Sequence, residues 1–189
     1  MQVELSREAE NAAQRARGKF PKACTGFNAE YCWDNNMARK EKIIKLLASG
    51  FGSGLAPFAP GTMGTLVGIP ICLVCLPLIW PTRFLCVIVL SALAVFISGR
   101  AEIIYQKKDD QRIVIDEIAG FQVAMLPVAI TGLNLCVAFV LFRIFDIWKP
   151  FPIRNLQQLP GGWGVVIDDI VAGIYAGVVM LLLTLLFKF

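Results

Sequence analysis

The fold class is decided by the stretch VVIDDIVAGIYAGVVMLLLTLLF, residues 165–187. Apart from Asp168 and Asp169 near its start, the stretch is apolar or small, and it exceeds the roughly 20 residues that a membrane helix needs. Carboxylates at membrane depth are costly unless they are paired or bound, which makes them functional candidates. The stretch therefore predicts a membrane helix with a functional site near its first residues.

The composition indicates a membrane protein. Of the 189 residues, 57% are hydrophobic and 17% are charged, and the mean hydropathy is +0.65. Soluble domains carry about 25% charged residues, so this chain is depleted in charge. About half of the Lys and Arg residues precede residue 46, which favours a cytoplasmic N-terminus or, alternatively, a simple solvated tail.

The N-terminal segment is polar and differs from the rest of the chain. Residues 1–36 are predicted to be a weakly ordered extension, with helix favoured only in Ser6–Lys19, and they lack the apolar core of a signal peptide. From Met37 to Leu47, apolar and basic residues alternate, which predicts an amphipathic surface helix. Residues 37–189 are expected to form a single membrane-embedded domain.

Five apolar stretches predict an all-α fold, a polytopic membrane helical bundle of about four to five membrane helices. Several stretches are shorter than an untilted span, so re-entrant segments are an alternative. If every stretch crosses once, the basic loops 100–112 and 149–164 share the cytoplasmic side with the N-terminus, as the positive-inside rule requires. The stretches are residues 64–80, 84–99, 114–131, 133–148 and 165–187.

Acidic residues stand at the ends of three of these stretches. Asp116 and Glu117 open the third, Asp146 closes the fourth, and Asp168 and Asp169 open the fifth. In the predicted topology all of them face the cytoplasm. Because Mg²⁺ prefers carboxylate oxygens, they predict a metal site, with one carboxylate free to act as a general base. Helix capping is the alternative, but it does not explain two adjacent acids twice.

The two acidic pairs also share a local pattern. The segment VIDEIAG at 114–120 resembles VIDDIVAG at 166–173, with one residue inserted. The small residues that follow each pair would let the two helices approach closely. An internal repeat and convergence on one local role are equally open interpretations of this pattern.

Two further segments could bind an anion. The segment SGFGSGLAPFAPGTMGT at 49–65 is too rich in Gly and Pro for a regular helix, so Gly61, Thr62 and Thr65 are expected in a loop that offers donors to a phosphate. Arg143 and Lys149 share a helical face with Asp146 and suit phosphate oxygens. The alternatives are a plain turn for the loop and an ion-pair ladder for the helix.

Four motifs in order resemble the phosphatidylglycerophosphatase A family of bacterial membrane phosphatases. They are GFGSGLAPFAPGTMGTL at 50–66, IDEIAGF at 115–121, FRIFDIWKPFPI at 142–153 and GGWGVVIDDIVAGIYAG at 161–177. The resemblance extends from about residue 46 to the C-terminus.

The resemblance implies a lipid phosphatase of the bacterial inner membrane. Its activity would be Mg²⁺-dependent hydrolysis of the terminal phosphate of phosphatidylglycerophosphate, giving phosphatidylglycerol, with the active site facing the cytoplasm. The partners implied are the phospholipid substrate and the membrane, with no nucleic acid, and the oligomeric state is left open. By motif match, the family's acidic metal-site and catalytic positions fall on Asp116, Glu117, Asp146, Asp168 and Asp169, its basic position on Lys149, and its loop threonines on Thr62 and Thr65.

Two other classes of function would use the same residues. A cation- or proton-coupled transporter is the main alternative, although transporters place their acids near the bilayer midplane and not at helix ends. A non-catalytic membrane scaffold, whose acids only cap helices, is the second. The absence of histidine excludes histidine-dependent phosphatases and Ser-His-Asp hydrolases.

Overall fold

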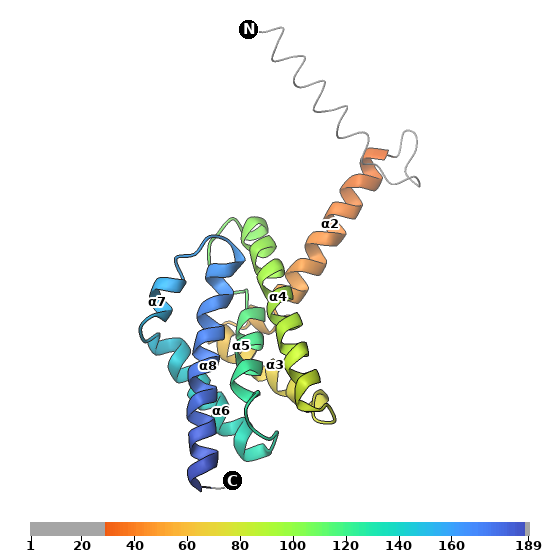
Figure 1. Cartoon of the computed structure of the whole chain (residues 1–189). Coiled ribbons are helices and arrows are strands. Elements are labelled where there is room, and N and C mark those ends of the chain that lie inside the picture. Colours follow the sequence, from red (N-terminus) through yellow and green to blue (C-terminus); the bar gives the residue numbers. More distant parts are fainter. Residues whose placement is uncertain (1–28, 188–189) are drawn as a thin grey trace. The chain divides into compact units, whose positions relative to one another are not determined.

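The computed structural model describes residues 29–187, with side chains from residue 38 onward, and this part of the chain is helical without strands. The chain divides into residues 1–43 and residues 44–189. The helix expected in Ser6–Lys19 lies outside the described residues. The elements, drawn in Figure 1, are α2 (Ala29–Ala48), the 3-10 helix η1 (Ser53–Leu55), α3 (Pro60–Val74), α4 (Trp80–Tyr105), α5 (Ile115–Met125), α6 (Gly132–Trp148), α7 (Ile153–Leu156) and α8 (Gly162–Phe187).

Among the described residues, two helices are long and apolar enough to cross a membrane. These are α4 and α8, of 26 residues each, and they contain the stretches 84–99 and 165–187. Large apolar side chains are exposed along both, for example Phe96 at 60% and Leu185 at 68%, as a lipid-facing surface requires. The all-helical membrane fold is therefore supported, whereas the count of four to five crossings stays a prediction.

Helix α5 is the centre of the second unit. It contacts α3, α4, α6 and α8, and only Glu117 and Val123 among its residues are not fully buried. The stretch 114–131 had suggested one continuous helix, but α5 ends at Met125. Pro127 explains the early end, because proline has no N–H to continue the helix by donating to the carbonyl of Val123. The Arg83 guanidinium then donates to the carbonyl of Met125 at 3.0 Å, which satisfies an open helix end.

A close helix crossing joins α5 to α8 through two glycines. A Cβ atom on Gly120 would lie 2.5 Å from the carbonyl oxygen of Asp169, and a Cβ atom on Gly173 would overlap the carbonyl oxygen of Gly120. Small residues thus bring the two backbones into contact, as the sequence pattern indicates. Asp116 precedes Gly120 by four residues, and Asp169 precedes Gly173 by four. The crossing therefore places one acid of each pair a single turn before the contact.

The Gly- and Pro-rich segment 49–65 was predicted to be a loop, but its last six residues are helical. Helix α3 begins at Pro60, so residues 60–65 are helical, and the loop expected over 49–65 ends at Ala59. Proline is well tolerated in the first turn of a helix, where its missing N–H is not needed. Gly61 and Gly64 are not turn residues here but contact points, because a Cβ atom on Gly64 would lie 2.5 Å from Cβ of Val114.

The amphipathic helix expected over 37–47 is present but longer. It belongs to α2, which starts at Ala29, so part of the predicted extension 1–36 is helical. The chain leaves α2 through a tight turn in which Gly50, Phe51 and Gly52 have positive φ. The backbone N–H of Val114 donates to the carbonyl of Ala48 at 2.8 Å, which ties the end of α2 to the start of α5.

Candidate active site

The five candidate acids lie together at one end of the helices. Asp116 and Glu117 are in the first turn of α5, Asp146 is in the last turn of α6, and Asp168 and Asp169 follow the start of α8. The carboxyl group of Asp169 is close enough to the other four to be repelled by each of them. In Figure 1, α5 and α8 begin at the same end of this unit. The convergence predicted from the sequence is present in the structure.

Lys149 connects the end of α6 to the start of α8. Its ammonium Nζ lies 2.6 Å from Oδ2 of Asp168, whose side chain is only 5% exposed. The residue caps α6 in the left-handed conformation, with φ of 45°, and this turn aims its side chain across to α8. Burial alone would lower the pKa of Lys149, but the hydrogen bond to Asp168 and the neighbouring carboxylates raise it above the ordinary value.

Arg143 connects α6 to α5. Its Nη1 lies 2.7 Å from Oδ2 of Asp146 and 3.5 Å from Oε1 of Glu117. The pair with Asp146 is the local i,i+3 contact that the ion-pair ladder anticipates. The contact with Glu117 comes from another helix, however, so Arg143 also belongs to the acidic centre. Its Nε is buried and has no partner within the part of the chain that the structure describes.

Two buried carboxylate oxygens have no hydrogen-bond partner among residues 38–187. They are Oδ1 of Asp116 and Oε2 of Glu117. Buried oxygens without a donor are rare in folded proteins, because the desolvation of each is then uncompensated. The centre holds five carboxyl groups against two basic side chains, Arg143 and Lys149. This excess of acceptors and negative charge suits a cation or protons.

The donor chemistry of the centre fits a hard cation, although its side chains do not form a closed ligand set. No three Cys, Asp or Glu side chains between residues 38 and 187 are already arranged to hold one ion. Arg143 and Lys149 instead occupy oxygens of Asp146, Glu117 and Asp168. The unpartnered Oδ1 of Asp116 is therefore open to a cation, and neighbouring carboxylates would have to rotate to complete a ligand set.

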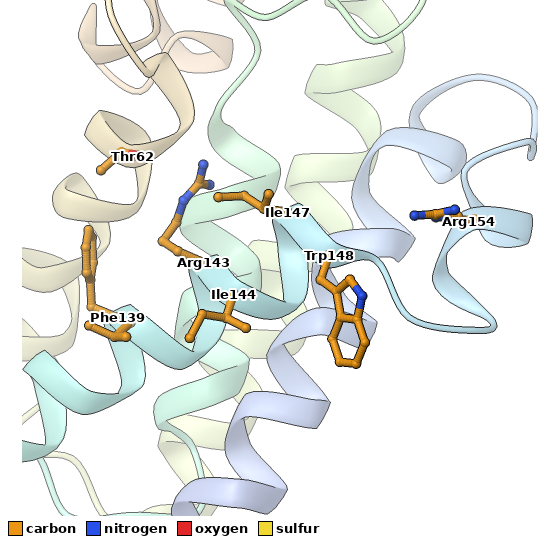
Figure 2. A pocket seen from close by; sticks show the side chains of 8 residues that line it. Thr62, Phe139, Arg143, Ile144, Ile147, Trp148 and Arg154 are labelled. Atoms are coloured by element: carbon orange, nitrogen blue, oxygen red, sulfur yellow. The ribbon is translucent and has the colours of Figure 1, made fainter.

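The two threonines predicted to bind phosphate lie in different surroundings. Thr65 is fully buried, and its hydroxyl donates to the carbonyl of Gly61 at 2.9 Å, inside α3. Thr62 is half-buried and lines a groove together with Arg143, as Figure 2 shows. Gly61 itself faces the centre, because a Cβ atom there would overlap Oε1 of Glu117. The start of α3 thus borders the acids through Gly61 and Thr62.

Comparison with known proteins identifies the family. The profile described as Phosphatidylglycerophosphatase A matches residues 46–184. A protein of Escherichia coli (strain K12) named Phosphatidylglycerophosphatase A is 40% identical over 131 residues, which cover 68% of this chain and 76% of that protein. This chain belongs to the phosphatidylglycerophosphatase A family. The resemblance drawn from four sequence motifs is confirmed, and the protein is a phosphatase.

The matches to two further relatives cover most of each relative's length. A Haemophilus influenzae protein, also named Phosphatidylglycerophosphatase A, is 39% identical over 155 residues, which are 78% of this chain and 94% of the relative. A Bacteroides thetaiotaomicron protein with the provisional name phosphatidylinositol-3-phosphatase is 36% identical over 149 residues, which are 74% of this chain and 92% of that protein. No solved structure gives a significant match to this chain. The region matched by the phosphatidylglycerophosphatase A profile contains every candidate site residue.

Sequence reasoning missed a polar cluster that immediately precedes α5 in the chain. The Arg112 Nε lies 2.7 Å from Oδ1 of Asp110, and its guanidinium stacks 3.9 Å from the ring centre of Tyr105. The hydrogen bond from Arg112 lowers the pKa of the buried Asp110 to about 2. The cluster orders the turn that leads into α5. A signal was present in the sequence, since Asp110 and Arg112 have the i,i+2 spacing of an Asx-type turn.

Proposed function

We propose that this protein hydrolyses the terminal phosphate of phosphatidylglycerophosphate, giving phosphatidylglycerol and phosphate, at the cytoplasmic face of a bacterial inner membrane. Family membership supports a phosphatase acting on a phospholipid. The observation that carries the proposal is the gathering of five acids, Arg143 and Lys149 near the start of α8, a helix long enough to span a membrane. At that position, a lipid phosphate can reach the centre while the acyl chains stay in the bilayer.

The proposed cofactor is Mg²⁺. Asp116, Asp168 and Asp169 would hold it, because these side chains come from the two helices that cross at Gly120 and Gly173, and Asp116 offers an unpartnered oxygen. When bound, the ion would neutralise phosphate charge and lower the pKa of a water molecule. The rest of the chemistry falls to side chains that surround these three acids.

Glu117 is proposed as the general base. Its Oε2 is buried and unpartnered, so it can accept a proton from a water molecule held beside the phosphate. As the water oxygen bonds to phosphorus, the bond between phosphorus and the glycerol oxygen breaks, and that oxygen takes up a proton from solvent water, while Glu117 later releases its proton to solvent. Arg143 keeps its contact with Oε1 of Glu117, at 3.5 Å, and thereby orients the carboxylate.

Lys149 and Arg143 are proposed to bind the phosphate oxygens. Each is already close to the acids, at 2.6 Å from Asp168 and 2.7 Å from Asp146 respectively. An incoming phosphate would share these cations with the carboxylates, so the negative charge that develops during transfer meets two preplaced positive groups. Both groups come from α6 and its cap, which makes the end of α6 the phosphate-binding side of the centre.

Phosphate release from phosphatidylglycerophosphate in detergent micelles tests the function. We expect release with Mg²⁺ and none with excess EDTA, and we expect slower release from phosphatidylinositol 3-phosphate, the substrate class in the Bacteroides relative's name. Asp169→Asn should abolish release, whereas Asp110→Asn, outside the centre, should retain it. A folded protein that releases no phosphate but conducts ions in liposomes would support the transporter alternative and refute the proposal.

A further inference from the structure

A groove of about 660 Å³ runs along α6 beside the acidic centre. Its wall is an apolar stripe on one face of α6, in which Val140, Ile144 and Ile147 are 55%, 49% and 72% exposed. Arg143 lies on the same face and is shared between the groove and the acids, where it pairs with Asp146. Figure 2 shows Arg143 between Thr62 and Trp148 in this view. An apolar surface therefore leads directly to a group of the active site.

The far end of the groove meets a second, more polar pocket of about 420 Å³. Trp148 and Arg154 line both spaces, and Lys149 and Asn155 line the second one. Because Lys149 binds Asp168, the polar pocket also reaches the acidic centre. The two spaces together offer apolar contact on one side and basic groups on the other, with Arg154 at their junction.

Arg154 is the cation at this junction that the proposed reaction does not use. It is exposed at the start of α7, and it makes no ion pair or hydrogen bond within residues 38–187. Arg143 and Lys149, in contrast, are both paired with carboxylates. A planar guanidinium without a partner, placed where an apolar groove meets a polar pocket, suits a phosphate group that is attached to an apolar chain.

We propose that Arg154 binds the phosphodiester of a membrane phospholipid whose acyl chain lies along the α6 stripe. This inference rests on the proposed function and adds a second phosphate subsite to it. The proposed substrate carries two phosphates, a terminal monoester and a diester linked to diacylglycerol. The monoester goes to Lys149 and Arg143, and the diester goes to Arg154. Lipid recognition is thus separated from the hydrolytic centre, and the diester-binding residue stays in place after the monoester is removed.

Charge complementarity favours a lipid over a second copy of the chain as the occupant. The groove and the polar pocket are lined by Arg143, Lys149 and Arg154, and no acidic side chain lines either. The exposed surface that a second copy of α6 would bring has the same basic groups, which would repel. An anionic lipid places negative charge against the arginine and hydrocarbon against the isoleucines.

Native mass spectrometry of the detergent-solubilised protein tests the subsite without turnover. We expect the wild type to retain phosphatidylglycerol, the product that keeps the diester, better than diacylglycerol with the same acyl chains. Arg154→Gln should lower the retention of phosphatidylglycerol about tenfold, toward that of diacylglycerol, because a charge-assisted hydrogen bond is lost. Lys108→Gln removes an exposed basic residue outside both pockets and should leave retention unchanged.

The apolar stripe has its own matched pair of variants. Ile147→Asn should lower the retention of both lipids, whereas Ile103→Asn, at a similarly exposed isoleucine on α4, should not; their exposures are 72% and 70%. A dimer that Ile147→Asn dissociates, with lipid retention unchanged, would assign the groove to a second copy and overturn the proposal.

Kinetics separates this proposal from the proposed function. Arg154→Gln should raise KM for phosphatidylglycerophosphate about tenfold and keep kcat within about twofold. A wild-type protein that releases no phosphate from this lipid refutes the proposed function, yet the retention experiment still decides the subsite. Equal retention and equal KM for Arg154→Gln and Lys108→Gln, with an active wild type, would refute the subsite alone.

Discussion

Replacing Gly120 by alanine should separate α5 from α8 and disable the acidic centre. The new Cβ atom would lie 2.5 Å from the carbonyl oxygen of Asp169 and 2.8 Å from Cε2 of Phe142. Neither neighbour can rotate away easily, since one is backbone and the other is a fully buried ring. The two helices must therefore move apart for the methyl group to fit.

The size of the effect follows from these distances. Non-bonded heavy atoms prefer a separation of about 3.5 Å, so a 2.5 Å contact requires a shift of about 1 Å. Overpacking of this kind costs about 1–3 kcal/mol of stability. Asp116 and Asp169 are held on either side of the crossing, and a misplacement of about 1 Å in a catalytic group can cost about 100-fold in rate. We expect kcat to fall about 100-fold in a protein that still folds.

The assay is phosphate release from phosphatidylglycerophosphate in micelles, together with thermal unfolding followed by tryptophan fluorescence. Gly177→Ala is the matched control, on the partner helix α8 at a looser point of its contact with α5. Its Cβ atom would lie 3.3 Å from the carbonyl oxygen of Ala124 and 3.4 Å from Cγ of Pro127. We expect this control to keep kcat within about threefold, because the strain is a few tenths of an ångström.

Two results would refute this reasoning. If Gly120→Ala kept wild-type kcat, the spacing of the acids across the crossing would not matter for catalysis. If Gly177→Ala lost as much activity as Gly120→Ala, the loss would come from helix packing in general. A third variant, Gly173→Ala, enters the same crossing from the other helix and should match Gly120→Ala.

Other predictions concern the charged groups. Asp116→Asn and Asp169→Asn should each lower Mg²⁺-dependent phosphate release more than about 100-fold with little change in thermal stability, since each substitution removes one charge that repels its neighbours. Lys149→Gln should lower kcat by about 100-fold in the same assay, because a cation bound to the phosphate is lost. Asp110 has a pKa of about 2, depressed by Arg112, so its stabilising effect is present above about pH 4 and is lost as the pH falls toward 2. Acid titration of the purified protein, with unfolding followed by tryptophan fluorescence, should show this loss in the wild type and not in Asp110→Asn.

Each of these predictions has an opposing result. Near-normal release from Asp116→Asn and Asp169→Asn would remove the metal site from the mechanism. A Lys149→Gln protein with unchanged kcat would make the ammonium purely structural. An identical acid profile for wild type and Asp110→Asn would mean that the pair with Arg112 does not stabilise the folded state.

The membrane helices and the acids were predictable because each leaves a local signal. A long apolar stretch produced α8, and acids next to such stretches are conspicuous against the low charge of the chain. The positive-inside rule then placed Asp116, Asp146 and Asp168 at one end, and the structure brings them together. The pairing of Arg143 with Asp146 was also foreseeable, since it needs only i,i+3 spacing.

The remaining features depend on tertiary contacts that no local pattern encodes. Lys149 reaches Asp168 and not Asp146 because it adopts the left-handed conformation at the end of α6. Gly61 and Gly64 looked like loop residues, but their role is to let α3 contact Glu117 and Val114. Glycine has the same low helix propensity in both settings, so sequence could not separate a turn from a close helix contact.

Arg154 and Ile153 were missed for the same reason, because their roles also depend on tertiary contacts. Arg154 contributed to the topology argument only as one more positive charge in a loop. Its position beside Trp148 depends on α7, a four-residue helix that is too short to show periodicity. Ile153, which is fully buried, anchors that helix, and nothing in the surrounding sequence marks it as a core residue.

The ion pair between Lys149 and Asp168 joins residues that are 19 apart and therefore closes the segment that carries α7. A phosphate that draws the ammonium toward itself competes with this closure. The free energy of phosphate binding is then linked to the order of the segment, since the ion pair that closes the loop is weakened when the phosphate binds. The hydrogen bond from the hydroxyl of Tyr175 to the carbonyl of Phe151, at 3.1 Å, remains as a second tie. Substitution of Lys149 consequently alters both the charge that meets the substrate and the order of the segment that carries Arg154.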